Sequence, residues 1–382
     1  MRTLRKHSAV FGVALAATVA LAGCSGGGTD TNAAPAAQGD AAGIATAQSN
    51  LDAYLNPPTW QGPTDPVKTS GLSGKRVVYI NVSSSIPVLK YWSDTLKVIL
   101  NDTAGVQLEE IDAKGSVDEA NKGFQQAIAS KADVVVLVAL FPDLFTQQIA
   151  AAHAQGMKVI TAQSGVPGDI SKGQDAEVSF DYVKVGQLIA DWMIVDSKGT
   201  GKATIFSSDD VPASQPQVNG TKDEVAKLCP GCDVTVSDVQ IPQWETGIPT
   251  AFQSALNTDP DRTYFLPLYD GQGLTGLSAI RSAGAGEKAN VGTFNATPGI
   301  VDGLNDPTSG LKLDIGGHNE WWAYAMADQI FRELSGTAPV ENYNIGLRVF
   351  DQSNKDLITG TDEFSWYDYD GYKAEFAKLW TK

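Results

Sequence analysis

Hydrophobic and polar positions alternate in a regular order from Gly74 onward. Short runs rich in Val and Ile are each followed by a longer segment with helical spacing of apolar residues. The predicted strands are KRVVYINV, VQLEEIDA, ADVVVLVAL, KVITAQ, AEVSF, KATIFSS, DVTVSDVQI, TYFLPLY, NVGTFNA and LKLDIGG. Between them, Val185, Leu188 and Trp192 share one face of a predicted helix. This alternation predicts an α/β protein with doubly wound parallel sheets that helices cover on both faces.

Ten strands are more than one compact sheet usually contains, so we expect two lobes. In open α/β sheets, ligands bind beyond the carboxyl ends of the strands. The residues at these ends are Ser83–Ser85, Phe141–Asp143, Gln163–Ser164, Ser208–Asp209, Gln243–Trp244, Tyr269–Asp270, Asn295–Ala296 and His318–Asn319. They offer amides, hydroxyls, carboxylates, an imidazole and aromatic rings, without a nucleophile and base pair. This set is typical of a site for a neutral, hydroxyl-rich small molecule.

The chain begins with a basic segment and an apolar run over residues 10–22. The run is too short to span a bilayer and ends in small residues, as export signals do. The sequence LAGC at 21–24 resembles the lipobox of bacterial lipoproteins. This resemblance implies that residues 1–23 are removed and that Cys24 is lipidated and anchors the protein to the outer face of the cell membrane. The alternative is a soluble exported protein with a chance cysteine.

Residues 24–73 are small, polar and rich in Pro and Gly, which is linker composition. We expect a flexible tether behind the anchor, with one short helix at AQSNLDAYL.

Cys229 and Cys232 lie in LCPGC, between a helix-like run and a predicted strand. Outside the cytoplasm such a pair most commonly forms a local disulfide. The alternative, a thioredoxin-like redox pair, would follow a strand and open a helix. A zinc site would need more ligands, and the chain after residue 23 has only His153 and His318 to offer. We therefore predict a structural disulfide and no metal.

Several segments taken in order resemble the periplasmic sugar-binding proteins of ribose/galactose type, the type I periplasmic binding proteins. These segments are GKRVVYINV, VQLEEIDAKGSVDEANKGFQQAIASKADVVVLVAL, GMKVITAQ and VSFDYVKVGQLIADWMI, and the resemblance extends roughly over residues 74–350. Such proteins are substrate-binding subunits of ABC importers and share their fold with lactose-repressor-type regulators. The export signal, with no DNA-binding segment before the fold, makes the importer subunit the expected one.

The resemblance implies two lobes joined by three hinge crossings, with the ligand captured between them and delivered to a permease. We expect lobe 1 to comprise residues 74–180 plus 318–342, and lobe 2 to comprise 181–317 plus 343–382. We also expect a monomer without a cofactor.

The resemblance places the family's ligand aspartate at Asp270 and a second ligand position at His318, where a glutamine is more usual. The complete predicted ligand-binding set is Ser84, Ser85, Trp92, Phe141, Gln163, Trp244, Asp270, Asn295 and His318. Polar members would hydrogen-bond hydroxyls, and aromatic members would stack on the ligand. Gln163 and Ser164 stand where ribose-binding members carry an Asp-Arg pair. This departure argues against a plain aldopentose, and a polyol, a glycoside or a sugar with an apolar substituent fits.

Charge and motifs exclude other functions. The 28 Lys and Arg against 44 Asp and Glu give a net charge of −16, which argues against a nucleic-acid partner. GQGLTG at 271–276 lacks the later acidic residue of a dinucleotide site, and YDYDG at 367–371 lacks the remaining ligands of a calcium loop. No G-x-S-x-G or H-E-x-x-H motif occurs, so we predict no enzyme. The rival hypotheses are a non-sugar ligand (a signalling molecule or an aromatic compound), an exported hydrolase or oxidoreductase, and a structural surface protein.

Overall fold

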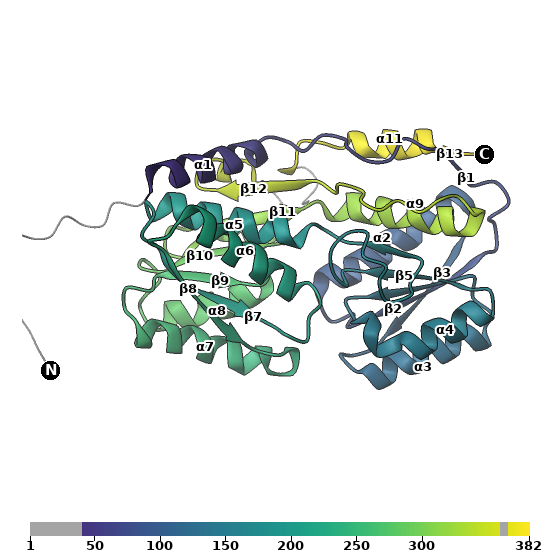
Figure 1. The fold of residues 1–382 in the computed structure, drawn as a ribbon, viewed down its shortest axis with the longest axis horizontal. Helices are drawn as coiled ribbons and strands as arrows, with labels where there is room; N and C mark the ends of the chain where they lie inside the picture. The colour runs from purple at the N-terminus through teal and green to yellow at the C-terminus, as the bar shows by residue number, and fades with distance from the viewer. Residues whose placement is uncertain (1–39, 360–365) are drawn as a thin grey trace, which may run out of the picture. The chain divides into compact units, whose positions relative to one another are not determined.

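Two open sheets form the framework of the computed structural model, which describes residues 40–359 and 366–382 (Figure 1). The sheet of lobe 1 has five parallel strands in the order β3-β2-β4-β5-β6. These are β2 (Arg76–Asn81), β3 (Gln107–Asp112), β4 (Val134–Val138), β5 (Lys158–Ala162) and β6 (Ala176–Val178). β4 is buried along its whole length, as expected for a central strand with helices on both sides.

Helices of lobe 1 come from two distant parts of the chain. They include α2 (Pro87–Ala104), α3 (Val117–Ala129), the 3₁₀ turn η1 (Pro142–Phe145), α4 (Thr146–Ala154) and α9 (Asn319–Ser335). Ser116 caps α3 by accepting a hydrogen bond from the backbone N–H of Glu119, and Pro142 occupies the first turn of η1. α9 packs against α2 and against the central strands, so it closes the core of this lobe.

The sheet of lobe 2 has six strands in the order β12-β11-β10-β9-β7-β8. These are β7 (Lys202–Ser207), β8 (Asp233–Asp238), β9 (Tyr264–Pro267), β10 (Asn290–Phe294), β11 (Leu311–Gly317) and β12 (Leu347–Asp351). The ten predicted strands are all present in the two sheets. β12 was not predicted from the pattern, and it pairs with β11 in the antiparallel direction.

Two glycines let the first helices of lobe 2 approach closely. Its helices are α5 (Tyr182–Asp196), α6 (Ser214–Leu228), α7 (Trp244–Thr258) and α8 (Asp270–Ser282), with the 3₁₀ turns η2 (Ile241–Gln243), η3 (Val301–Asn305) and η4 (Lys355–Leu357). A Cβ on Gly186 would lie 2.1 Å from the carbonyl oxygen of Gln217, and one on Gly220 would lie 2.2 Å from that of Val183. The apolar face predicted for α5 is buried at this contact and against the sheet.

Three of the segments that connect the lobes are those that the fold class predicts. The chain passes from β6 to α5 near Asp181, from β11 to α9 at His318, and from α9 back to β12 over residues 336–346.

Residues 40–73 correct the prediction of a flexible tether. α1 (Ala41–Leu55) packs on α5 and α6 of lobe 2 and buries Gly43, Ala47 and Leu51, which are spaced four residues apart on one helical face. The chain then crosses to lobe 1, where β1 (Val67–Lys68) forms a parallel pair with a C-terminal strand. The prediction of a tether is therefore wrong for this segment, and residues 24–39 lie outside the described residues.

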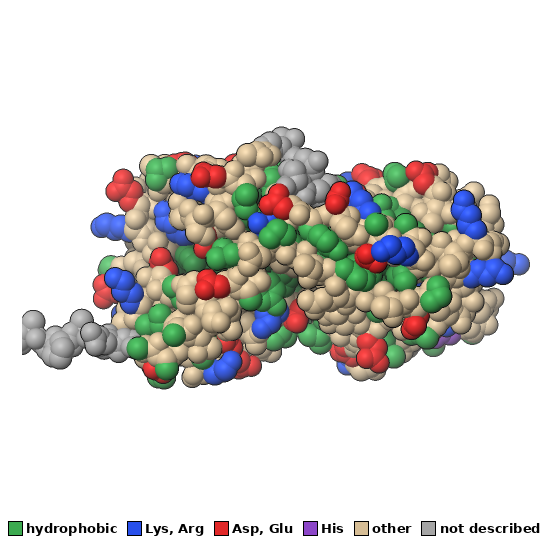
Figure 2. Space-filling model, turned by 90° about the horizontal axis from the view of Figure 1, so that it is seen from above, with side chains coloured by type: hydrophobic (Ala, Val, Ile, Leu, Met, Phe, Trp, Pro, Cys, Tyr) green, Lys and Arg blue, Asp and Glu red, His purple; other side chains and the backbone are tan. Residues whose placement is uncertain are grey.

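The C-terminal segment corrects the assignment of residues 343–382 to lobe 2. α11 (Gly371–Leu379) contacts α9, and β13 (Trp380–Thr381) pairs with β1, so both elements belong to lobe 1. Trp60 from the N-terminal segment stacks on Trp321 of α9 at 5.6 Å and meets the edge of Phe376 of α11 at 4.9 Å. Figure 2 shows acidic and basic side chains interspersed over the face that carries α1 and α11.

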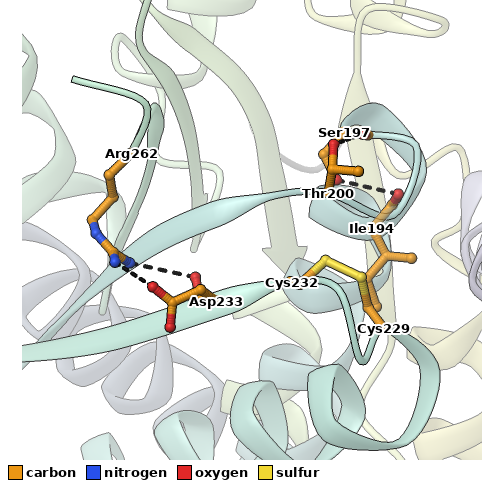
Figure 3. Close-up of a disulfide and its surroundings, with 7 residues drawn as sticks. All are labelled: Ile194, Ser197, Thr200, Cys229, Cys232, Asp233 and Arg262. Carbon is orange, nitrogen blue, oxygen red and sulfur yellow. Dashed lines mark hydrogen bonds and ion pairs between the residues drawn. A yellow bond between two sulfur atoms is a disulfide. The ribbon is translucent and has the colours of Figure 1, made fainter. Parts of the chain in front are cut away.

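Cys229 and Cys232 form a disulfide at the turn between α6 and β8, with an S–S distance of 2.04 Å (Figure 3). The predicted pair is thus present, at the end of a helix rather than at its start. Directly after it, the carboxylate of Asp233 accepts a hydrogen bond from Arg262. The arrangement fixes a turn and does not present the sulfur atoms as a redox site in front of a helix.

Candidate ligand-binding cleft

A cavity of about 90 Å³ lies at the carboxyl ends of the strands, with walls from both lobes. Its lining residues are Val82, Ile86, Val88, Leu89, Trp92, Ala139, Gln163, Tyr182, Val211, Ala213, Ile241, Trp244, Leu268, Tyr269, Phe294 and Asn295. Four predicted ligand contacts are among them: Trp92, Gln163, Trp244 and Asn295. The cavity therefore lies where a doubly wound fold places its ligand.

Gln163 presents the clearest unsatisfied polar group in this cavity. It follows β5 directly, has a positive φ of 54° and is 2 % exposed. Its Oε1 accepts hydrogen bonds from the Tyr182 hydroxyl at 2.7 Å and from the backbone N–H of Phe180 at 3.4 Å. Its Nε2 has no hydrogen-bond partner among the described residues. Because Oε1 is occupied by donors, Nε2 remains as a donor for a ligand acceptor.

Asn295 is the corresponding amide of lobe 2 and follows β10 directly. Its φ is 112°, that of Ala296 is 50°, and its backbone N–H donates to the carbonyl oxygen of Ile315 at 2.9 Å. Two consecutive non-glycine residues with positive φ are uncommon and persist only where the surroundings hold them. The Asn295 side chain makes no hydrogen bond to any other described residue, so both polar ends of its amide are available to a ligand.

Two tryptophans form aromatic walls whose orientation is fixed by their N–H groups. Nε1 of Trp92 donates to Oδ1 of Asn319 at 2.8 Å, and the ring stacks on Trp322 with centroids 4.5 Å apart. Nε1 of Trp244 donates to Oγ of Ser208 and to the carbonyl oxygen of Val239, both at 2.9 Å. With these polar atoms satisfied, the rings offer apolar faces and edges to the cavity.

Asp270 is not among the lining residues, although the family resemblance placed a ligand there. It is the first residue of α8 and is 1 % exposed. Its carboxylate accepts hydrogen bonds from the backbone N–H of Thr297 at 2.5 Å and from the Thr297 hydroxyl at 3.0 Å. Burial raises the pKa of Asp270 to about 7. The carboxylate thus holds the loop after β10 rather than facing the cavity.

His318 also lies outside the cavity lining, in an aromatic cluster behind the hinge. Its ring is fully buried, lies 4.3 Å from the ring of Tyr367, and has Nε2 at 3.2 Å from the carbonyl oxygen of Tyr369. Burial lowers the pKa of His318 to about 3, so the imidazole is neutral at physiological pH. Its surroundings make it part of the core that joins β11 to α9.

The remaining predicted contacts, Ser84, Ser85 and Phe141, do not line the cavity either. The hydroxyl of Ser84 donates to Oε1 of Glu110 at 2.6 Å. The hydroxyl of Ser85 lies 2.8 Å from that of Ser83, and Phe141 precedes η1. The two serine side chains thus satisfy local polar groups.

Sequence reasoning missed the apolar part of the lining. Ile86, Val88 and Leu89 surround the first turn of α2, and Leu268 and Phe294 lie at or just beyond the ends of β9 and β10. The available signal was position alone, since these residues lie beside predicted strand ends. The prediction selected mainly polar residues at those ends and therefore omitted these apolar ones.

The sequence of the chain matches a family model over most of the part that forms the two lobes. Residues 77–338 match the model described as "Periplasmic binding protein domain". The chain belongs to the periplasmic binding protein family. A search of curated protein sequences found no match.

Solved structures share this fold at low sequence identity. An ABC sugar transporter subunit from Rhodobacter sphaeroides 2.4.1 is 15% identical with a TM-score of 0.66, and the alignment covers 74% of this chain and 100% of that one. A 5-methylthioribose transporter solute-binding protein from Thermotoga lettingae TMO is 15% identical with a TM-score of 0.68, covering 79% and 97% of the two chains. An ABC transporter solute-binding protein from Mycobacterium smegmatis is 19% identical with a TM-score of 0.66, covering 75% and 98%.

Family membership settles the broad class of the protein. Periplasmic binding proteins are extracytoplasmic and bind solutes rather than transform them, which confirms the prediction of a binding protein rather than an enzyme. Among the described helices, none is long and apolar enough to cross a membrane.

Proposed function

We propose that this chain is the lipid-anchored solute-binding subunit of an ABC importer, and that it captures a sugar, polyol or glycoside with an apolar substituent in the cleft. The observation that carries the proposal is the buried Nε2 of Gln163, a donor without a partner in a cavity with two tryptophan walls. A hydroxylated ligand would satisfy this donor. Closure of the two lobes around the ligand would then be the signal that the permease reads.

The lining favours a ligand with a polar end and a substantial apolar part. Twelve of the sixteen lining residues have side chains without an amide, a hydroxyl or a charge. The polar groups are the amides of Gln163 and Asn295 and the hydroxyls of Tyr182 and Tyr269. Burying an unpaired polar group costs free energy, so a ligand with hydroxyls on every side would be disfavoured here.

Ligands in structures of the same fold include fully hydroxylated compounds and one compound with this divided chemistry. The proteins from Agrobacterium vitis were solved with allitol and with α-D-tagatopyranose, and the Thermotoga protein with 5-methylthioribose. The last ligand joins a sugar to an apolar methylthio group. We infer that the ligand of this chain has a similar division into hydroxyls and an apolar group.

The anchor would attach to the lobe that α1 covers. Cys24 precedes Asp40, the N-cap of α1, by 16 residues. An extended segment of this length reaches about 55 Å, which is enough to hold a monomer clear of a membrane surface. Anchoring would be tested by radiolabelled fatty-acid incorporation into the wild type and into Cys24→Ala, with no label expected in the variant.

A mostly apolar or aromatic ligand is the second candidate, and the same lining supports it. Such a ligand would occupy the space between Trp92 and Trp244 and would accept one hydrogen bond from Gln163. Competition would separate the two candidates: a hydroxylated compound and an aromatic compound would be tested against each other by tryptophan fluorescence.

The decisive experiment is a thermal-shift screen of the mature protein against sugars, polyols, 5-methylthioribose, aryl glycosides and aromatic acids. A ligand present at about 100 times its Kd adds about 2.7 kcal/mol of stability, which raises the melting temperature by several degrees. Gln163→Leu should weaken binding about tenfold or more, because a ligand acceptor is left unpaired. Gln155→Leu is the matched control, since Gln155 is exposed at the end of α4. If no compound in any class raises the melting temperature, the proposed function is wrong.

A further inference from the structure

Lobe 1 holds its cleft amide through a buried acid on the neighbouring strand. Thr161 of β5 pairs with Glu177 of β6 in the parallel register. Gln163 stands two residues after Thr161, with positive φ. The next residue, Ser164, donates its backbone N–H to Oε1 of Glu177 at 3.0 Å. The acid therefore fixes the backbone immediately after the residue that carries the amide.

Lobe 2 repeats this arrangement at the same spacing, although in lobe 1 the hydroxyl of Ser179 also donates to Oε1 of Glu177. Thr293 of β10 pairs with Asp314 of β11, again in parallel. Asn295 stands two residues after Thr293, also with positive φ. The next residue, Ala296, donates its backbone N–H to Oδ1 of Asp314 at 2.9 Å. In both lobes one acid oxygen accepts the loop N–H, and the other has no hydrogen-bond partner among the described residues.

Both acids are enclosed and face other acids. Glu177 is 2 % exposed and Asp314 is fully buried. The charged group that acts on Glu177 is Asp169, and the one that acts on Asp314 is Asp270. The phenol of Tyr182 also faces Glu177. Burial raises the pKa of Glu177 to about 7 and that of Asp314 well above its usual range.

The backbone that these acids hold has a conformation that is unfavourable for non-glycine residues. Non-glycine residues with positive φ are uncommon, and the cleft amides of both lobes are carried by such residues. Both of these amides line the cavity. A contact that fixes the following N–H is the kind of support that such a conformation needs.

We propose that Glu177 and Asp314 are positioning residues, each of which holds the loop that presents the ligand-binding amide of its own lobe. The proposal rests on the proposed function in one respect, namely that Gln163 and Asn295 contact the ligand. In lobe 2, Asp270 adds a second support, because it accepts both hydrogen bonds from Thr297.

The test measures the loops directly and needs no ligand. In the full mature chain, amide hydrogen exchange is followed at Ser164 and Ala296, and the side-chain amide resonances of Gln163 and Asn295 by NMR. Glu177→Ala should speed exchange at Ser164 about tenfold, the equivalent of one ordinary hydrogen bond, and shift the Gln163 resonances. Ala296 and Asn295 should not change in this variant.

The mirror variant provides the matched control. Asp314→Ala should affect Ala296 and Asn295 and leave Ser164 and Gln163 unchanged. Glu177→Gln and Asp314→Asn retain an acceptor oxygen of the same shape, so they should restore slow exchange and the wild-type resonances. If the alanine variants leave their own lobe's signals unchanged, or if the amide variants behave like the alanine variants, the proposal is overturned.

If an alanine variant fails to fold, the pH dependence of amide exchange tests the positioning role instead. Between about pH 4.5 and about pH 7 an opened loop releases the Glu177 proton whereas the closed loop retains it, so opening becomes easier and exchange at Ser164 should accelerate relative to an exposed amide, with no further change above about pH 7. Glu177→Gln has no group to ionise there and should lack this extra acceleration. Identical profiles for the two proteins would refute the positioning role. A failed ligand screen would contradict the proposed function and would leave these loop measurements unaffected.

Discussion

Lobe 1 and lobe 2 each place one amide and one tryptophan in the cleft, but they fix these groups by different means. In lobe 1, the side chain of Gln163 is itself held, because Phe180 and Tyr182, the first residue of α5 of lobe 2, donate to its Oε1. In lobe 2, the side chain of Asn295 is not held by any described residue, whereas the loop behind it is anchored by two buried acids. The side-chain donor of lobe 1 is thus preorganised with the help of a hydroxyl from lobe 2, whereas in lobe 2 the backbone is preorganised.

This difference implies that the cleft amides of the two lobes contribute differently to ligand binding. A donor that is already oriented binds an acceptor without losing side-chain freedom. Because the oxygen of the Gln163 amide already accepts hydrogen bonds, the amide can offer only its nitrogen to a ligand. A free amide on a rigid loop can rotate to present either its oxygen or its nitrogen. We infer that lobe 1 selects for an acceptor on the ligand, and that lobe 2 adapts to what the ligand offers when the lobes close.

The largest effect is expected from removing the second anchor of lobe 2. Asp270→Ala leaves the backbone N–H and the hydroxyl of Thr297 without their acceptor and creates a cavity beside α8. We expect a loss of about 2–4 kcal/mol in the free energy of unfolding, measured by urea denaturation. Asp302→Ala is the control, since Asp302 is exposed on the neighbouring turn η3. Equal stability of the two variants would show that lobe 2 is not anchored in this way.

The next effect concerns pH and the acid of lobe 1. Burial raises the pKa of Glu177 from 4.5 to about 7, so the folded chain binds this proton more tightly than the unfolded chain. The stability that this proton contributes is fully present below pH 4.5, the pKa of Glu177 in the unfolded chain. It is lost as the pH rises through about 7, the pKa in the folded chain.

Urea denaturation of the wild type and of Glu177→Gln over about pH 5 to about pH 8 would measure this loss. The wild type should lose on the order of 2–3 kcal/mol relative to the variant across the range, since one pKa unit corresponds to 1.36 kcal/mol. Parallel curves would mean that Glu177 is ionised throughout.

A smaller effect is expected from releasing the oriented donor of lobe 1. Tyr182→Phe removes the hydroxyl that holds Oε1 of Gln163 and leaves the ring in place. Affinity for a compound identified in the screen should fall about tenfold, or about 1.4 kcal/mol, with little change in stability. Tyr54→Phe is a suitable control, because the hydroxyl of this half-buried residue of α1 is remote from the cavity lining. An unchanged affinity in Tyr182→Phe would remove the proposed contrast between the lobes.

The N-terminal segment and the C-terminal segment that pairs with it are the parts of the molecule that the sequence pattern described least well. Residues 40–73 have the composition of a linker, and their helix shows its buried face only when α5 and α6 are placed beside it. The pairing of β1 with β13 joins residues more than 300 positions apart and depends on two residues in each strand. A local pattern cannot specify such a contact, because neither segment is amphipathic over enough residues to be recognised alone.

The sequence by itself determined the ten predicted strands, the two lobes and the places where Trp92, Gln163, Trp244 and Asn295 enter the cleft. It could do so because the length and apolar character of a strand fix where the strand ends, and ligands bind beyond those ends. It also placed Cys229 and Cys232 as neighbours, since two intervening residues keep them within bonding reach.

Only the tertiary structure decided which polar groups at those ends face the cavity. Asp270 and His318 stand at strand ends, but the first is held by Thr297 and the second by the aromatic cluster behind the hinge. The apolar lining and the acids Glu177 and Asp314 likewise come from different elements that meet only in the folded lobes. The physical reason is that a side chain's direction depends on backbone dihedrals and on packing partners distant in the chain, and neither is encoded in local periodicity.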